Sequence, residues 1–438
     1  MLGILAILLD PFLLIGFFLG ILYLYLTATF DFWECRGVPF KKPTVLVGNF
    51  GSLLLFRKSQ PEGVKEMYQW FKDERFFGAF RVRSPVLILR DPELVKSVCV
   101  KDFSHFLNRG IPINNAQDPL SGHLFNLEGH KWKGLRSKLT PAFSSGKLKR
   151  MFYLLGECGE ELQRLIKEAS RNVDRAVEVR ELATKFTIDV IGSCAFGIQI
   201  NALTDEESEF HRAAKTLSKP SYKATLWRML RTSMPRLYRL LGVQIVDPGV
   251  TKFFMDVVSQ MIDQREDNGT TRHDFMDLLI ELKNKGTLEN EVSNPRVCND
   301  EDVQAAKEIV LDESTIAAQA FVFFAAGYET SSNTIAFCLY ELALNQDIQD
   351  KTRREVCGAI EAQGGKLTYD AVQEMKYLDM VILGMRFALL QIKMGIISFL
   401  KDHRVEICGK STVPIKFSRR SLVTTSEEGF WLAITPSS

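Results

Sequence analysis

The fold is decided by one stretch of sequence, Ala320-Phe321-Val322-Phe323-Phe324-Ala325-Ala326-Gly327-Tyr328-Glu329-Thr330-Ser331-Ser332. It lies in a segment from about Ser314 to Asn345 that has no proline and a single glycine. Apolar residues dominate this segment without leaving a clean water-facing stripe, and this pattern predicts a helix buried through the centre of a domain. At ~1.5 Å per residue, roughly thirty residues span about 45 Å, which is longer than an ordinary globular helix.

The middle of this stretch contains residues that a buried helix usually avoids: Gly327, Glu329 and Thr330. A glycine inside a helix costs ~1 kcal/mol relative to alanine, and an acid or a hydroxyl in a dry core must be satisfied or used. One interpretation is a packing glycine beside a hydrogen-bonded polar pair. The other is an oxygen-activating site, in which the glycine admits a flat cofactor, the hydroxyl donates to bound oxygen and the acid passes protons.

The composition of the whole chain excludes several classes of protein. At 438 residues with a formal net charge of +2, the chain can bury a large core and has no clustered basic excess, so no nucleic-acid partner is predicted. The eight cysteines are scattered, with no C-x-x-C pair and no zinc spacing. We therefore predict reduced thiols in a reducing compartment and no metal-binding cluster.

The N-terminal 30 residues are predicted to form a transmembrane anchor. Residues 11–30 are uncharged, and twenty such residues are enough for the ~30 Å hydrocarbon core of a bilayer. A cleaved signal peptide, the rival interpretation, would need a basic start and a shorter apolar run, whereas no Lys or Arg precedes Arg36. Because the positive charge follows the span, the rest of the chain is expected on the cytosolic side of the membrane.

Behind the anchor, residues 31–45 contain two prolines and are predicted to form a stiff hinge, with residues 46–438 as the main body. Two short β-type runs, 80–83 and 86–89, predict a hairpin, and Asp91 is expected to cap a helix that begins at a proline. Residues 146–282 are mostly helical in pattern. The predicted fold class is therefore mainly α with small β-sheets.

Several further motifs occur in order along the chain: N-R-G at 108–110, H-K-W-K-G-L-R at 130–136, L-T-P-A-F at 139–143, Y-E-L-A at 340–343 and R-R-E at 353–355. Together with A-G-Y-E-T at 326–330, they resemble the membrane-anchored cytochrome P450 monooxygenases, and most of all the insect microsomal group that oxidises xenobiotics. The resemblance implies a haem cofactor, small apolar substrates, electrons from NADPH through a reductase, and a single-pass protein of the endoplasmic reticulum membrane.

The resemblance also implies roles for residues of the central helix. Thr330 would hold or protonate bound oxygen, and Glu329 would assist proton delivery, so these two are the expected catalytic residues. Ala326 and Gly327 would lie against the haem and bind it.

A second set of residues is implied to bind the haem propionates. Trp132 and Arg136 are four residues apart and would share one face of a helix, from which both would donate hydrogen bonds to a propionate. Arg109 resembles a further propionate contact. Three lysines in the same region suggest either a basic face for an acidic redox partner or an ordinary solvated face. They are Lys131, Lys133 and Lys138.

Two elements that the family requires are not found in this sequence. These are the E-x-x-R helix and the loop F-x-x-G-x-x-x-C-x-G, whose cysteine thiolate ligates the iron. Residues 373–383 resemble the segment that leads into the E-x-x-R helix, and residues 384–391 resemble the helix that follows the cysteine loop. An internal deletion is therefore predicted at 383/384. Ile382 stands where the ligand is expected. Cys408 lacks the glycine-rich context and is interpreted as a thiol at the edge of a strand.

These observations predict an incomplete P450-like fold with an N-terminal transmembrane helix, in which haem-thiolate monooxygenation is impaired. The alternative is a haem-free, membrane-tethered binding protein or a non-functional isoform. Because residues 375–400 contain no proline, they are also expected to run as one helix, with Gly384 and Gly395 as its weak points.

Overall fold

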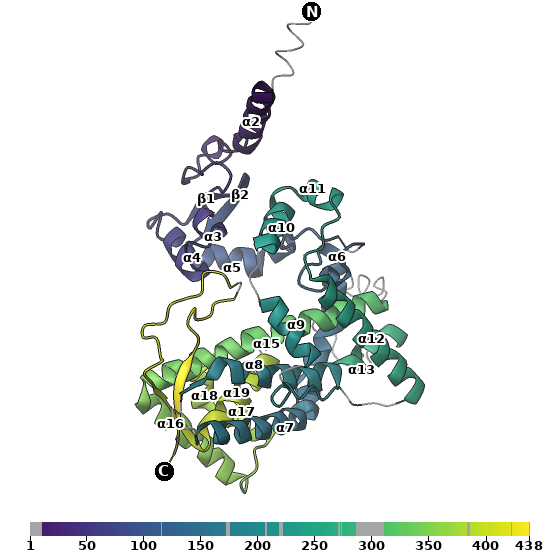
Figure 1. Ribbon diagram of the computed structural model, residues 1–438, viewed down its shortest axis with the longest axis vertical. Helices are drawn as coiled ribbons and strands as arrows, with labels where there is room; N and C mark the ends of the chain where they lie inside the picture. The colour runs from purple at the N-terminus through teal and green to yellow at the C-terminus, as the bar shows by residue number, and fades with distance from the viewer. Residues whose placement is uncertain are drawn as a thin grey trace, which may run out of the picture. The chain divides into compact units, whose positions relative to one another are not determined.

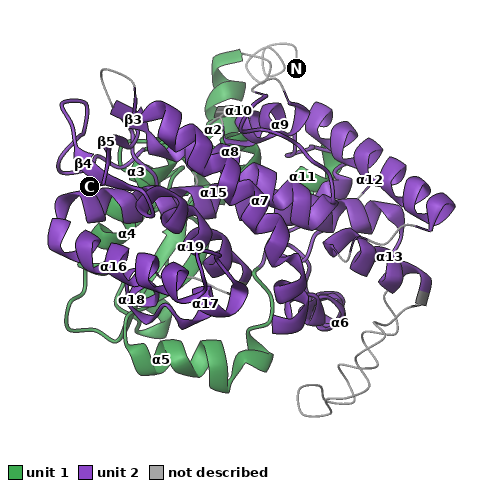
Figure 2. Cartoon of the chain, turned by 90° about the horizontal axis from the view of Figure 1, so that it is seen from below, with its two compact units in different colours: residues 1–109, 221–241, 419–424 green, residues 110–220, 242–418, 425–438 purple. Residues whose placement is uncertain are grey.

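The computed structural model describes residues 11–114, 116–171, 176–205, 208–218, 222–269, 272, 274–285, 311–382, 386–421 and 423–437. These residues are mostly helical and include two small antiparallel sheets (Figure 1). The chain divides into two compact units (Figure 2). Unit 1 comprises Met1–Arg109, Ser221–Leu241 and Arg419–Thr424, and unit 2 comprises Gly110–Pro220, Gly242–Ser418 and Thr425–Ser438. The predicted class, mainly α with small sheets, is confirmed.

Unit 1 contains short helices and one hairpin. Its elements are α2 (Pro11–Thr27), η1 (Glu34–Arg36), α3 (Gly51–Leu54), α4 (Gln60–Tyr68), β1 (Phe76–Arg81), β2 (Ser84–Leu89), α5 (Pro92–Lys96), η2 (Ser97–Lys101), η3 (Phe103–His105), α10 (Tyr222–Ser233) and α11 (Pro235–Leu240).

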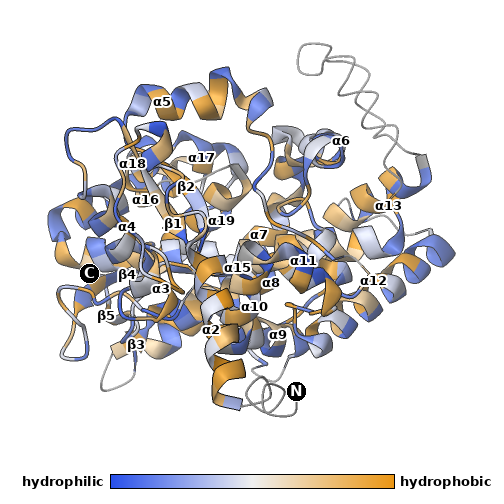
Figure 3. Ribbon diagram, turned by 90° about the horizontal axis from the view of Figure 1, so that it is seen from above, coloured by the Kyte–Doolittle hydropathy of each residue, from blue (hydrophilic) through white to orange (hydrophobic). Residues whose placement is uncertain are grey.

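The helix α2 is uncharged along its whole length and is largely orange in Figure 3. Leu26 is its one buried residue, and Phe12 is 82% exposed. With 17 residues, α2 is shorter than the predicted span of twenty. Within the residues that the structure describes, no helix is both long and apolar enough to cross a membrane.

The predicted hairpin is present, but its turn lies two residues earlier than the sequence suggested. β1 pairs antiparallel with β2 from Phe76↔Leu89 to Arg81↔Ser84, so the turn consists of Val82 and Arg83. Pro85 lies inside β2, which a two-stranded sheet tolerates because the missing N–H falls on a free edge. The strand β1 is fixed in the core of unit 1 by phenylalanines that are fully buried.

The predicted cap of α5 is confirmed. Oδ1 of Asp91 accepts hydrogen bonds from the backbone N–H groups of Glu93 at 2.8 Å and Leu94 at 3.2 Å. Pro92 occupies the first position of the helix, where a backbone N–H would have no partner within the helix, so the missing N–H of proline is tolerated.

Unit 2 contains the long helices and a three-stranded antiparallel sheet in the order β3-β5-β4. Its elements are η4 (Pro119–Gly122), α6 (Gly129–Leu139), η5 (Thr140–Phe143), α7 (Ser145–Ala169), β3 (Ala176–Glu178), α8 (Val179–Ile191), η6 (Gly192–Phe196), α9 (Glu209–Ser218), α12 (Pro248–Asn268), α13 (Phe275–Lys285), α15 (Glu313–Leu344), α16 (Gln346–Ala362), α17 (Tyr369–Glu374), α18 (Lys376–Val381), α19 (Arg386–Leu400), β4 (His403–Ile407) and β5 (Trp431–Pro436).

The helix α15 is the central element of unit 2, and its bounds agree with the predicted Ser314–Asn345 to within one residue at each end. Oδ1 of Asp312 caps its start by accepting from the backbone N–H of Thr315 at 2.7 Å. More than half of its 32 residues are buried, because α8, α12 and α19 pack around it. The prediction of a helix buried through the centre of a domain is confirmed.

The predicted single helix over residues 375–400 is wrong. α18 ends at Val381, and Ile382 is extended, with φ −120° and ψ 131°. Ile382 is also buried, so its side chain packs in the core at the point where the helix ends. The predicted junction at 383/384 lies outside the described residues. α19 runs through Gly395 without a break. A Cβ at this position would lie 2.6 Å from Cδ1 of Ile335 on α15, so the glycine allows the two helices to pack closely.

Candidate functional site

The polar segment in the middle of α15 sends successive side chains in different directions. Tyr328 points into the core, where its hydroxyl donates to the carbonyl oxygen of Ala214 at 3.0 Å and lies 2.9 Å from the hydroxyl of Ser218. The backbone carbonyl of Tyr328 accepts a hydrogen bond of 3.1 Å from the Thr187 hydroxyl of α8. Tyr328 therefore fixes the rotation of α15 against α8 and α9.

The packing of α15 against α8 explains why residue 327 is a glycine. A Cβ built at this position would lie 2.4 Å from Cδ1 of Ile191 on α8, well inside van der Waals contact. The absence of a side chain thus lets α8 and α15 approach each other. This contact supports the packing interpretation of the glycine.

Ala326 and Thr330 lie one helical turn apart on the opposite, exposed side of α15. Oγ1 of Thr330 donates to the carbonyl oxygen of Ala326 at 2.6 Å, and Thr334 repeats this bond one turn later, to the carbonyl of Thr330 at 2.8 Å. The exposed face of α15 therefore carries hydroxyl groups whose protons are directed back to the helix and whose lone pairs face outward.

Glu329 is half-buried between these two sides of the helix. Burial raises the pKa of Glu329 above its ordinary value, and the positive charge of Arg180 on α8 opposes that increase. Arg180 forms no direct ion pair with Glu329; its Nε donates instead to Oδ1 of Asn333 at 3.0 Å. Nδ2 of Asn333 in turn donates to the backbone carbonyl of Glu329 at 2.8 Å.

Trp132 and Arg136 share one face of α6, as the spacing of four residues predicted. The guanidinium carbon of Arg136 lies 5.2 Å from the centroid of the Trp132 ring, which is a cation–π contact. Trp132 is buried, whereas Arg136 is exposed and can therefore reach an anionic group. This arrangement is compatible with a propionate contact and equally with a structural pair.

The end of α6 is connected to α15 through aromatic rings. Phe143, in the turn that follows α6, lies 5.4 Å from Phe323 of α15 and 6.4 Å from Phe387 of α19, measured between ring centroids. The segment that carries Trp132 and Arg136 and the helix that carries Thr330 are thus parts of one packed unit. Arg109, by contrast, is an exposed residue at the end of unit 1.

The predicted basic face of α6 is not formed by all three lysines. Lys131 is exposed and Lys133 is half-buried, but Lys138 is only 6% exposed and has its own partner in the fold. Positions 131 and 138 are seven residues apart, so a helix places both lysines on the same side. In the last turn of the helix, the rest of the fold covers that side and buries Lys138. The expectation of a three-lysine docking face is therefore wrong.

Three of the described cysteines are buried thiols. Burial raises the pKa of Cys158 and of Cys338 to about 12 and that of Cys194 well above its ordinary value, so these three are neutral near pH 7. Cys408 follows β4 in a turn, where its sulfur accepts a hydrogen bond from the Ser411 hydroxyl. The turn around Cys408 agrees with the interpretation of this residue as a thiol at the edge of a strand.

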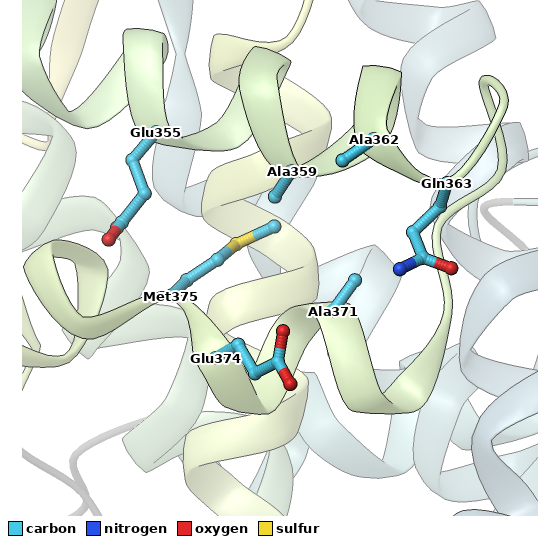
Figure 4. A pocket seen from close by; sticks show the side chains of 7 residues that line it. All are labelled: Glu355, Ala359, Ala362, Gln363, Ala371, Glu374 and Met375. Carbon is cyan, nitrogen blue, oxygen red and sulfur yellow. The ribbon is translucent and has the colours of Figure 1, made fainter.

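One surface pocket of about 250 Å³ lies between α16 and α17 (Figure 4). Its walls include Glu355, Ala371 and Met375. Both carboxylate oxygens of Glu355 already accept hydrogen bonds from the first N–H groups of α18, those of Tyr377 and Leu378. No lining residue belongs to α6 or α15, so this pocket is separate from all predicted site residues.

The comparison with known families agrees with the resemblance found in the motifs. The sequence profile of the family described as Cytochrome P450 matches residues 41–382. Cytochrome P450 6B7 of Helicoverpa armigera is 37% identical over 361 residues, which are 82% of this chain and 68% of that protein. Cytochrome P450 6a2 of Drosophila melanogaster is 39% identical over 383 residues, which are 85% of this chain and 71% of that protein.

A third relative aligns over almost the whole of both chains. Probable cytochrome P450 6a14 of Drosophila melanogaster is 30% identical over 521 positions, which cover 96% of this chain and 98% of the relative. The fold and these matches define the class of haem-thiolate monooxygenases. The chain belongs to the cytochrome P450 family, whose members use a haem cofactor and receive electrons from NADPH through a reductase.

The described residues fit the haem in part. Trp132 and Arg136 are donors suited to its propionates, and the exposed face of α15 that carries Ala326 and Thr330 bears hydroxyl groups. Ile382, the residue expected from the sequence at the ligand position, is an apolar side chain buried in the core and offers no donor atom for the iron.

Arg180 and Asn333 are polar neighbours of the site that the sequence did not reveal. They lie 153 residues apart in the chain, and neither belongs to a motif that singled it out.

Proposed function

We propose that this chain is a membrane-bound cytochrome P450 of the xenobiotic-oxidising type in which haem-thiolate chemistry is impaired. The observation that carries the proposal is the short connection between α18 and α19. α18 ends at Val381 and α19 begins at Arg386, so four residues stand where the family places the E-x-x-R helix and the cysteine loop. Four residues are too few to form a helix and a ligand loop.

The alignments support the same interpretation. The family profile stops matching at residue 382, one residue before the proposed junction. Because 96% of 438 residues is about 420, roughly one hundred of the 521 positions aligned with the third relative have no counterpart in this chain. A single internal segment of about this size would be large enough to contain both absent elements.

The residues of α15 from Ala326 to Thr330 would retain their roles in binding and in proton transfer. Thr330 presents an exposed hydroxyl, and Glu329 is a half-buried acid whose pKa burial raises above its ordinary value. Trp132 and Arg136 would hold an anionic group, a haem propionate by family resemblance, and Arg109 is a further proposed contact for such a group. Ala326 would form part of the exposed face of α15, and Gly327 would allow α15 to pack closely against α8. The substrates would be small apolar compounds.

The apolar N-terminal segment would anchor the protein in the endoplasmic reticulum membrane with its body in the cytosol, residues 31–45 acting as the hinge. This is supported by α2, an uncharged helix whose large side chains are mostly exposed. Alkaline carbonate extraction of microsomes tests the anchor. The full chain is expected in the membrane pellet, and release of the full chain into the supernatant would contradict it.

The impairment is tested with a reduced carbon-monoxide difference spectrum of the purified protein. We expect no thiolate-type Soret band from this chain. The matched control is the same chain with the corresponding segment of a relative inserted between Leu383 and Gly384, in which the band should appear. A strong thiolate-type band from the unaltered chain would overturn the proposal.

The alternative is a haem-free, membrane-tethered protein that binds apolar ligands or competes for the reductase. One observation favours it: Ile382, which is expected where the iron ligand stands, is an apolar side chain buried in the core. A pull-down with NADPH-dependent reductase tests competition. Absence of binding by a chain that is folded by circular dichroism would exclude this role.

A further inference from the structure

The end of α2 is fixed to the turn of the hairpin β1–β2, and both belong to unit 1 (Figure 1). Just past the helix, the Thr29 hydroxyl donates to the backbone carbonyl of Arg83 at 2.5 Å. The guanidinium carbon of Arg83 lies 3.9 Å from the centroid of the Tyr25 ring, which is a cation–π contact between the hairpin turn and the last turn of α2. The rings of Phe30 and Phe80 add a third contact, with 5.4 Å between their centroids.

Trp33 makes this connection stiff. Its indole N–H donates to the carbonyl oxygen of Ala79 on β1 at 3.0 Å, and its side chain is buried. A Cβ at Gly78 would overlap the Trp33 ring, so the glycine makes room for the indole. The backbone N–H of Gly78 also donates to the carbonyl of Pro39 at 2.8 Å. The first part of the proposed hinge is therefore packed along β1, and the hairpin turn keeps its place beside the end of α2.

Tyr25 sets the level of this turn relative to a membrane. Tyrosines at the ends of apolar membrane segments lie at the lipid–water interface, with the ring toward the hydrocarbon and the hydroxyl toward the headgroups. Tyr23 and Tyr25 are exposed and lie near the end of α2. A guanidinium group stacked on Tyr25 is therefore at the level of the lipid phosphates.

The Arg83 side chain is suited to an anionic group at this level. Its contact with Tyr25 uses one face of the guanidinium plane, whereas the N–H donors lie within that plane and can give two parallel hydrogen bonds to a phosphate. The exposed charged side chains of residues 31–42 and of the end of β1 are positive on balance. They are Arg36, Lys41, Lys42 and Arg81 against Asp31 and Glu34.

We propose that Arg83, stacked on Tyr25, binds the phosphate of an anionic phospholipid in the membrane that holds α2. The inference rests on the proposed anchoring by α2 and adds to it a headgroup site formed by the folded hairpin. The anchor alone would enter neutral and anionic bilayers equally well, because α2 carries no charge. The site therefore gives the protein a preference for anionic bilayers.

The test measures this preference with the full chain, diluted from detergent into two kinds of vesicles. One kind is phosphatidylcholine alone, and the other is phosphatidylcholine with phosphatidylserine in a two-to-one ratio. The vesicle-bound fraction is determined by flotation. Arg83→Gln should lower the preference for the anionic vesicles about fivefold, the equivalent of ~1 kcal/mol for one basic residue near an anionic surface. Its binding to the neutral vesicles should stay unchanged, because α2 is intact.

Two further variants examine the stacking and the charge separately. Tyr25→Leu keeps α2 apolar but removes the ring beneath the guanidinium, so it should lower the preference by a smaller factor than Arg83→Gln. Arg83→Lys retains the charge without the planar pair of donors and should restore part of the preference. An unchanged preference in Tyr25→Leu would contradict the part assigned to stacking.

The matched control is Lys96→Gln on α5, which also removes one exposed positive charge. α5 follows the far end of β2, and six strand residues at ~3.3 Å each place that end about 20 Å from the hairpin turn. This distance exceeds the screening length of ~8 Å at physiological ionic strength, so the preference should not change.

An undiminished preference in Arg83→Gln, or equal losses in Arg83→Gln and Lys96→Gln, overturns the proposal. Equal binding of the wild type to both kinds of vesicles refutes the headgroup site and leaves the anchor standing. Binding to neither kind refutes the anchor itself, and with it the site that depends on the anchor.

Discussion

The ammonium group of Lys393 lies 2.8 Å from Oδ1 of Asp379 and also donates to the carbonyl oxygen of Val372 at 2.8 Å. Lys393 belongs to α19 and its side chain is 1% exposed, whereas that of Asp379 on α18 is 40% exposed. A buried ammonium group requires partners, because removal of its hydration shell is costly. This ion pair therefore joins the two helices on either side of the proposed junction.

Asp379→Ala should lower the free energy of unfolding by about 2 kcal/mol, because it leaves the buried charge of Lys393 with a single carbonyl partner. Lys393→Met should cost less than about 1.5 kcal/mol, since a methionine of similar volume fills the same space without a charge. The double variant should resemble Lys393→Met alone. Urea denaturation measures all three, and a larger loss in Lys393→Met than in Asp379→Ala would contradict the argument.

Gly327→Ala combines two opposing effects. Alanine gains ~1 kcal/mol over glycine in a helix, but its Cβ would meet Cδ1 of Ile191, and the resulting overpacking costs about 1–3 kcal/mol. The same substitution in an Ile191→Val background, where Cδ1 is absent, should stabilise the protein. A double-mutant cycle in thermal unfolding should therefore give a coupling of about 1 kcal/mol or more. Additive effects at the two positions would show that the contact with Ile191 is not the reason for a glycine at position 327.

Tyr328→Phe should lower the free energy of unfolding by about 1–3 kcal/mol, because the carbonyl of Ala214 and the hydroxyl of Ser218 would lose their common partner inside the protein. The matched control is Tyr153→Phe, at an exposed tyrosine of α7, which should change the stability by less than about 0.5 kcal/mol. Equal effects of the two substitutions in denaturant titrations would rule out the anchoring role of Tyr328.

Asp189 on α8 should make the stability depend on pH. Its carboxylate accepts backbone hydrogen bonds from Ala202 at 2.6 Å and Leu203 at 3.0 Å, yet burial raises its pKa to about 6. The folded state thus holds a proton that the unfolded state, with a pKa of about 3.9, releases. This contribution to stability is present below about pH 4 and is lost as the pH rises to about 6, by up to about 3 kcal/mol.

The Asp189→Asn variant, which cannot ionise, should lack this part of the pH dependence. Denaturant titrations of both proteins at pH 5 and pH 7.5 measure the difference. The wild type should lose more stability than the variant over that interval. Parallel changes in the two proteins would mean that the Asp189 carboxyl does not titrate there.

The sequence predicted those features of the fold that depend on neighbouring residues. The bounds of α15 follow from a continuous apolar segment without proline, and the cap at Asp91 follows from an acid placed directly before a helix-starting proline. The hairpin was predicted, but its turn was placed two residues too late, because the β-type pattern does not indicate which residues pair across the two strands. The helix break at Ile382 was missed, since local propensity favoured continuation and burial of the side chain decided otherwise.

By itself, the sequence determined the central helix, the order of the motifs and hence the family, because helix periodicity and short motifs are local properties of the chain. Only the tertiary structure decided what each residue of the A-G-Y-E-T segment contacts. It placed Gly327 against Ile191, directed Tyr328 into the core and left Thr330 exposed. These outcomes depend on helices far apart in sequence, whose relative rotation is set by packing and buried hydrogen bonds.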